Sequence, residues 1–250
     1  MSGHSKWATI KHKKGALDAK RGKIFSKLSK EISVAAKTGG DPDTNPRLRL
    51  ALQKAKEANM PSDNVDRALK KGTGELPGVT YEEVIYEGYG AGGIAILVEA
   101  LTDNKNRTTS EIRTIFTKQN GNMAGQGSVS WMFSKKGYFA ILKASTDEEK
   151  LMNLVLELGA EDMKTDDEES FEVITNTRDF EKVKEGLVKN KIQWQEAEIT
   201  MLPNSTIMLD LPKAKQVLGL VELLEDNDDV QNVYSNFDVP AEIMKQIEKE

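Results

Sequence analysis

Cysteine is absent from the 250 residues, which excludes disulfides, thiolate metal sites and cysteine nucleophiles. His4 and His12 are the only histidines, so a zinc site built on several imidazoles is excluded as well. The longest purely aliphatic run, Ile94–Val98, is far shorter than the roughly 20 residues that a membrane helix needs. The N-terminus also lacks the apolar segment of a secretory signal. We therefore expect a cytoplasmic protein with no membrane partner.

Recognisable catalytic arrangements are lacking too. Neither histidine lies in a Ser/His/Asp or metal-binding pattern. The glycines of Gly88–Gly93 match a dinucleotide fingerprint, but an aliphatic strand follows where the fingerprint needs a helix, which favours a glycine-rich turn. The acidic runs Asp166–Glu169 and Glu225–Asp229 lack the spacing and glycine of an EF-hand, and we interpret them as solvated loops. We expect no enzymatic activity, no cofactor, no metal site and no small-molecule substrate.

Charge is distributed unevenly along the chain, although the formal net charge is only −5. Residues 1–72 contain 17 basic and 7 acidic side chains, which leaves 18 basic and 33 acidic ones in residues 73–250. A basic end on an acidic body indicates a region that contacts a polyanion.

Apolar spacing predicts three helices in the basic region. Ile24, Leu28 and Ile32 follow one another every four residues and define one helix face over residues 20–37. Asn45-Pro46 is typical of an N-cap followed by proline at the first helical position, so a second helix is expected to about residue 58. A third is expected over residues 62–72. Residues 1–19 show no apolar period, and we interpret them as an extended or mobile arm.

Mixed α and β patterns follow the glycine-rich linker at residues 72–78. We predict strands at 84–86, 94–100 and 128–133, and a helix over 111–118 that begins with a Thr108–Glu111 capping box. Strands at 138–142, 171–174 and 194–201 alternate with helices at 147–158 and 178–189, which favours a ferredoxin-like unit. A strand at 207–209, a helix at 213–224 and a strand at 230–234 complete a second such unit.

The predicted fold class is therefore α+β, with a three-helix N-terminal domain followed by two ferredoxin-like α/β domains, one inserted in the other. The predicted domains are residues 1–78, with the basic arm; 79–134 plus 205–240, the middle domain; and 135–204, the inserted domain.

Lysines dominate the basic arm and the outer face of the first helix, opposed there only by Asp18. Neutralising phosphates releases counterions, so such a stripe favours nucleic-acid binding, with phosphate contacts outnumbering base contacts. Trp7 can stack on a base. The alternative interpretation is a solvated helix face. The residues expected to contact nucleic acid are His4, Lys6, Trp7, Lys11, Lys13, Lys14, Lys20, Arg21, Lys23, Lys27, Lys30, Arg47 and Arg49.

Two further basic positions have two interpretations each. Arg47 and Arg49 lie in the first turn of the second helix, where cations oppose the helix dipole, so they indicate either a bound anion or surface salt bridges. Lys105 and Arg107 lie in the polar segment 103–107, which we interpret either as a connecting loop or as a phosphate-contacting loop.

Several segments resemble the YebC family. They are Met1–Trp7, Lys20–Phe25, Asn45–Arg49, Asn59–Pro61, Tyr86–Gly90, Thr102–Thr108 and Gly127–Phe133. The resemblance implies three domains around a cleft, the first helical and the other two α/β. It also implies a nucleic-acid-binding regulator, either a DNA-binding transcriptional regulator or a factor that acts on the ribosome through rRNA or tRNA, with possible relief of stalling at proline runs. The transcription machinery or the ribosome would be the partner.

Overall fold

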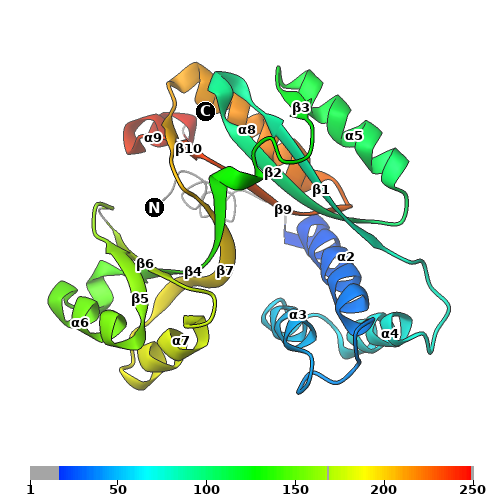
Figure 1. Ribbon diagram of the computed structural model, residues 1–250, viewed down its shortest axis with the longest axis horizontal. Coiled ribbons are helices and arrows are strands. Elements are labelled where there is room, and N and C mark those ends of the chain that lie inside the picture. Colours follow the sequence, from blue (N-terminus) through cyan, green and yellow to red (C-terminus); the bar gives the residue numbers. More distant parts are fainter. Residues whose placement is uncertain (1–16, 168, 249–250) are drawn as a thin grey trace.

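The computed structural model describes residues 17–167 and 169–248, which form a helical region followed by two α/β units (Figure 1). The α+β fold class is thereby confirmed. No helix in this part of the chain is both long and apolar enough to cross a membrane. The predicted arm lies outside the described residues except for its last three positions, which belong to the first helix.

Three helices form the N-terminal region: α2 (Leu17–Ala36), α3 (Pro46–Glu57) and α4 (Ser62–Thr73). Their apolar faces meet in a small core around Ile32, Leu48 and Ala68. Asn45 caps α3 as predicted, because its side chain accepts a hydrogen bond from the Leu48 amide at 3.1 Å. The Asn45 amide group also donates to the carbonyl oxygens of Ala35 and Gly39, which ties the end of α2 to the start of α3.

A four-stranded antiparallel sheet of order β3-β1-β2-β9 forms the middle unit. Ile96 and Val98 of β2 pack against Phe116 of α5 and Leu220 of α8 in one apolar core. Figure 1 shows both helices on the same face of the sheet. The elements are β1 (Glu82–Tyr89), β2 (Ala95–Thr102), α5 (Lys105–Lys118), β3 (Asn122–Ala124), β8 (Ile207–Met208), α8 (Leu211–Asp226), β9 (Val230–Ser235), β10 (Phe237–Asp238) and α9 (Ala241–Glu248).

Between β3 and β8 the chain forms a second antiparallel sheet, of order β5-β6-β4-β7. Phe139 and Val173 pack against Leu151 of α6 and Val183 of α7 in a separate core. The order of elements, βαββαβ, is ferredoxin-like. They are β4 (Phe133–Leu142), α6 (Glu148–Leu158), β5 (Ala160–Lys164), β6 (Ser170–Thr175), α7 (Phe180–Lys189) and β7 (Trp194–Pro203). The chain enters and leaves this unit on paired strands, with Phe133 opposite Pro203.

The predicted strand at 128–133 was wrong. Residues 130–132 form a 3₁₀ helix, and the third strand of the middle sheet is instead β3. The reason is Glu87, which is 2% exposed and whose carboxylate accepts hydrogen bonds from the amides of Gly127, Val129 and Ser130 at 2.6–2.9 Å. Burial acts to raise the pKa of Glu87, but these amide bonds outweigh it and lower the pKa. The segment is therefore wrapped around a carboxylate rather than extended.

The predicted start of α5 was also wrong. The helix begins at Lys105, six residues earlier than expected, and its N-cap is Asn104, whose side chain accepts from the Arg107 amide at 3.1 Å. The predicted capping box fails because Thr108 is already inside the helix and bonds elsewhere. By contrast, the glycine-rich segment is confirmed as a turn: it joins antiparallel β1 and β2, and Gly92 and Gly93 both have φ of 76°.

Candidate functional site

Three lysines of the predicted stripe contact the acidic loop, defined here as residues 225–229, which comprise the end of α8 and the connection to β9. Lys23 Nζ lies 3.2 Å from Asp226 Oδ1, and Lys27 Nζ donates to the Glu225 carbonyl at 2.8 Å. Lys30 Nζ lies 2.6 Å from Asp229 Oδ1 and 2.8 Å from the Asp228 carbonyl. The alternative of a solvated helix face is wrong for Lys27 and Lys30, which are partly buried against the loop, whereas Lys23 remains exposed beside its ion pair. The chain itself supplies the anionic partner from about 200 positions away.

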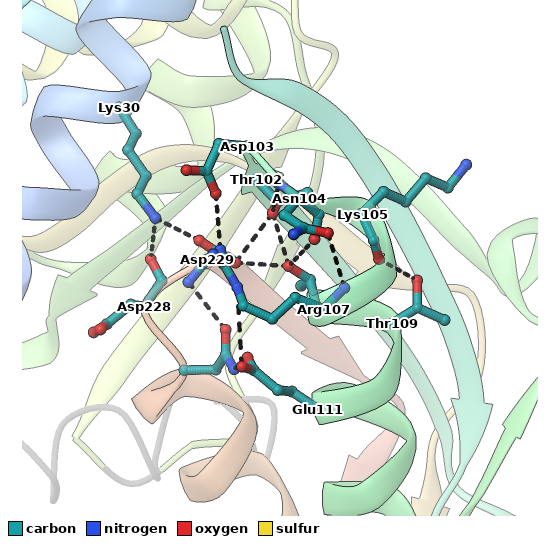
Figure 2. Close-up of polar contacts among 12 residues, drawn as sticks. Lys30, Thr102, Asp103, Asn104, Lys105, Arg107, Thr109, Glu111, Asp228 and Asp229 are labelled. Carbon is teal, nitrogen blue, oxygen red and sulfur yellow. Dashed lines mark hydrogen bonds and ion pairs between the residues drawn. The ribbon is translucent and has the colours of Figure 1, made fainter. Parts of the chain in front are cut away.

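Asp229 is the centre of this contact (Figure 2). Its side chain is 6% exposed, and one carboxylate oxygen pairs with Lys30. The other accepts from Thr108 Oγ1 at 2.6 Å, Arg107 Nη2 at 2.7 Å and Thr102 Oγ1 at 3.1 Å. A single carboxylate thus joins α2, the end of β2 and the first turn of α5.

The charge of Asp229 is strongly stabilised. Burial alone raises a carboxyl pKa, but hydrogen bonds from Lys30, Thr108 and Arg107 outweigh it and hold the pKa of Asp229 well below its usual range. Asp229 is therefore ionised at neutral pH. The interpretation of residues 225–229 as a solvated loop was wrong for this residue, since only its neighbours Asp226 and Asp228 are exposed.

Arg107 belongs to the same group of polar side chains around Asp229, which we call the Asp229 cluster. Besides Asp229, its guanidinium reaches Asp103 at 2.9 Å and Glu111 at 3.9 Å. The segment 103–107 is consequently the capped start of α5 and one wall of the cluster rather than a plain connecting loop. Figure 2 shows the exposed Lys105 side chain pointing away from these groups.

Arg47 and Arg49 differ in their partners. Arg47 forms salt bridges with Glu31 of α2 and Glu83 of β1, at 2.8 and 2.6 Å, which agrees with the salt-bridge interpretation. Arg49 donates to the carbonyl oxygens of Pro42 and Asp43, at 2.9 and 2.8 Å, in the turn before α3.

A polar cavity of about 530 Å³ lies at the junction of α2 with the middle unit. Its lining consists of Lys23, Lys30, Arg107, Tyr81 and six acidic or amide side chains. The Lys30 ammonium lies 5.7 Å from the centre of the Tyr81 ring. Within residues 17–167 and 169–248, no group of three or more His, Cys, Asp or Glu side chains is arranged to hold a metal ion.

The remaining predicted contact residues are placed as follows. Arg21 is exposed on α2, and Lys20 lies in the same helix but its side chain is outside the described part of the structure. His4, Lys6, Trp7, Lys11, Lys13 and Lys14 lie outside the described residues. The sequence interpretation missed Thr102, Thr108 and Asp229 as members of the cluster. An acidic run opposite a lysine stripe was the one available signal, and it does not specify which residues meet.

A second group of carboxylates was missed altogether. Glu172 and Glu196 both lie opposite Ala140 of β4, and Glu198 lies opposite Tyr138. Burial, and then the charges of Glu198 and Glu172, raises the pKa of Glu196 to about 7. Glu196 and Glu198 are two residues apart on β7, so strand alternation places them on one face, but the sequence gives no indication that Glu172 of β6 lies beside them.

Comparison with known proteins identifies the family. Residues 5–75 match the family model of the TACO1/YebC N-terminal domain, and residues 81–237 match that of the TACO1/YebC second and third domain. A protein of Geobacter sulfurreducens named a probable transcriptional regulatory protein is 58% identical over 248 residues, covering 99% of this chain and 100% of the relative. A protein of Natranaerobius thermophilus with the same name is 57% identical over 249 residues, covering 98% of this chain and 99% of that one.

A solved structure is also similar. The crystal structure of a conserved hypothetical protein from Aquifex aeolicus has a TM-score of 0.79 and 48% identity, and the match covers 92% of this chain and 95% of that chain. Matches of this length and identity, together with the shared fold, show that the chain belongs to the TACO1/YebC family.

Proposed function

We propose that this chain is a non-enzymatic regulatory protein that binds nucleic acid through its basic N-terminal region, and that it regulates transcription by binding DNA. The observation that carries the proposal is the charge separation between residues 1–72, with 17 basic and 7 acidic side chains, and the acidic remainder. The names of the relatives support a regulatory role.

Exposed cations beyond the acidic loop support the same proposal. Each of the helices α2, α3 and α4 has basic side chains that face solvent and for which the described part of the chain supplies no hydrogen-bond or ion-pair partner. They are Arg21, Lys54, Lys56, Arg67, Lys70 and Lys71. A phosphate backbone can contact such side chains without any change in the fold.

A ribosome-associated role in translation is the second candidate, and one observation favours it. Lysines outnumber arginines nine to four in residues 17–75, and α4 does not have the arginine and asparagine content typical of a helix that reads bases in the major groove. Lysine-dominated surfaces contact phosphates with little sequence information, which suits rRNA or tRNA recognised by shape.

Substitution of Lys13 and Lys14 by alanine tests nucleic-acid binding. The probes are a labelled 25-base-pair DNA duplex and an RNA hairpin, titrated at several salt concentrations. We expect weaker binding to both and a salt slope lower by about two, since each phosphate contact contributes about 0.9 to the slope. Lys182→Ala with Lys189→Ala, in the inserted unit, makes the same charge change and is the control. A salt slope equal to that of the wild type would contradict the proposal.

Gradient sedimentation of a cell lysate separates the two candidates. A protein that travels with ribosomes at low salt and leaves them at high salt supports translation and contradicts the transcriptional role. A protein that stays in the light fractions at both salt concentrations and protects specific promoter DNA supports transcription.

A further inference from the structure

The acidic loop occupies part of the lysine face that a nucleic acid would use. Lys23, Lys27 and Lys30 follow at spacings of four and three, so their side chains share one face of α2. Each of them meets an oxygen of residues 225–229 within 3.2 Å. With 14% of its side chain exposed, Lys30 is inaccessible to a phosphate in this arrangement.

The acidic loop offers the lysines two kinds of acceptor that can replace the oxygens of a phosphate backbone. Its acceptors include the carboxylates of Asp226 and Asp229, which carry full negative charges. They also include the main-chain carbonyls of Glu225 and Asp226, which belong to the last turn of α8, where the helix dipole is negative and carbonyls lack partners within the helix. The loop therefore offers closely spaced anionic acceptors along one side of α2.

The contact between the helical region and the middle unit is polar and separable. Among the described residues, the apolar core of the helical region and that of the middle unit have no member in common. The polar cavity lies between them, and further links include Lys37 to the Tyr81 carbonyl at 2.8 Å and Arg47 to Glu83. Residues 74–81, which join the two parts, form neither helix nor strand. Polar interfaces of this kind permit relative domain motion, and salt screens their exposed ion pairs.

We propose that the acidic loop and nucleic acid compete for Lys23, Lys27 and Lys30, so that the loop holds the protein in a closed form of low affinity. The proposal rests on the proposed function, because the loop can only oppose a ligand that the lysines bind. When only a fraction of molecules is open, the apparent dissociation constant exceeds the intrinsic one by the inverse of that fraction. Weakening the loop therefore raises the affinity, whereas a polyanion that binds the lysines opens the interface.

The test uses the full chain with Glu225→Gln and Asp226→Asn, which removes the Lys23–Asp226 ion pair and one neighbouring negative charge but leaves the main-chain acceptors and Asp229 in place. The probes are the 25-base-pair duplex and the RNA hairpin. The control is Glu222→Gln with Glu242→Gln, which removes two exposed charges of the same unit to which the described side chains of α2 supply no hydrogen bond or ion pair. We expect the loop variant to bind at least one probe about three- to tenfold more tightly than the wild type at low salt, and the control less than twofold. Equal gains in both variants would mean that only net charge matters, and would overturn the competition while leaving nucleic-acid binding intact. Absence of binding by every protein, the wild type included, would refute the proposed function and the competition together.

A distance measurement tests the opening itself. Because the chain has no cysteine, Leu50→Cys on α3 and Lys118→Cys on α5 give two unique labelling positions, both exposed. We expect the distance distribution between spin labels to move to longer values when the tighter-binding probe saturates the wild type. We expect a smaller shift in the same direction without probe in the loop variant, because the Lys30–Asp229 pair remains. A distribution that stays unchanged at saturating probe would overturn the competition even if the affinities differ.

Discussion

At the scale of single residues, Asp229 joins the helical region to the middle unit through Lys30, while three donors of the middle unit hold its carboxylate in place. Four donors from three elements converge on its two oxygens, and none of them is its neighbour in the sequence. Removing one member of a buried ion pair costs more than the pair itself contributes, because the remaining charge keeps its desolvation penalty. The carboxylate is therefore a far more sensitive position than the exposed aspartates beside it.

Asp229→Asn is expected to lower the free energy of unfolding at pH 7 by about 3–5 kcal/mol, measured by urea denaturation. Asp226→Asn is the control, and because its ion pair with Lys23 is exposed we expect a loss of less than about 1 kcal/mol. A carboxyl with a lowered pKa stabilises the fold above its unfolded pKa, about 3.9. That contribution is lost as pH falls through the folded pKa. The difference between wild type and Asp229→Asn should therefore shrink below about pH 4. A loss that is equally large at pH 3 would contradict this account.

At the scale of elements, apolar spacing predicted α2, α3, α4, α6, α7 and α8 to within a few residues, because each buries one continuous stripe. The prediction omitted β5, whose sequence Ala-Glu-Asp-Met-Lys pairs on one side only and shows no apolar alternation. It also misplaced the third strand of the middle sheet, because the conformation of residues 127–130 depends on Glu87, some 40 positions away. Apolar spacing therefore cannot predict a segment whose conformation depends on a side chain far away in the sequence.

Close packing of α2 on α4 gives a prediction at this scale. A Cβ at Gly72 would clash with the Ser33 carbonyl oxygen and would lie 2.6 Å from Ala36 Cβ. Gly72→Ala should therefore lower the free energy of unfolding by about 1–3 kcal/mol, because the helices have to separate. Gly22→Ala, also within a helix, meets nothing within 4 Å and should instead stabilise the protein by about 0.5–1 kcal/mol. Thermal or urea unfolding of both variants checks this, and equal effects would contradict it.

At the scale of the whole molecule, the sequence indicated which region is basic but not what that region contacts. The lysine stripe was recognisable because its members share a helix face. Its partner was not, because the loop lies about 200 residues further along and only the fold of the middle unit places it beside α2. The charge asymmetry that indicated a polyanionic ligand also means that the basic N-terminal region and the acidic remainder of the same chain attract each other.

The two sheets also bring like charges together. Tyr234 of β9 hydrogen-bonds Glu99 at 3.1 Å, and its pKa is raised by burial, then by the charges of Glu99 and Glu198. Carboxylates of the middle unit and the inserted unit therefore lie near each other where β7 approaches β9.

Glu196→Gln tests the cost of the carboxylate group on the inserted sheet, which consists of Glu172, Glu196 and Glu198. Because the pKa of Glu196 is raised to about 7, the folded state binds this proton more tightly than the unfolded state, and stability falls as pH rises from about 4.5 to 7. The variant should be about 1–2 kcal/mol more stable than the wild type at pH 8, a value reduced for partial solvent exposure. The gain should disappear near pH 4.5. Glu185→Gln, exposed on α7, is the control, and a gain of equal size at pH 5 and pH 8 would contradict the prediction.

The position of the acidic loop near the end of the chain has a consequence during synthesis. The inserted unit is made before α8 and β9, so the middle sheet lacks its edge strand, and α2 lacks its anionic partner, until residues 211–235 have been added. At typical elongation rates, the roughly 200 residues between Lys30 and Asp229 take on the order of ten to forty seconds. A nascent chain therefore displays its lysines uncovered throughout that interval, and we expect it to adhere to nearby polyanions more strongly than the finished protein does.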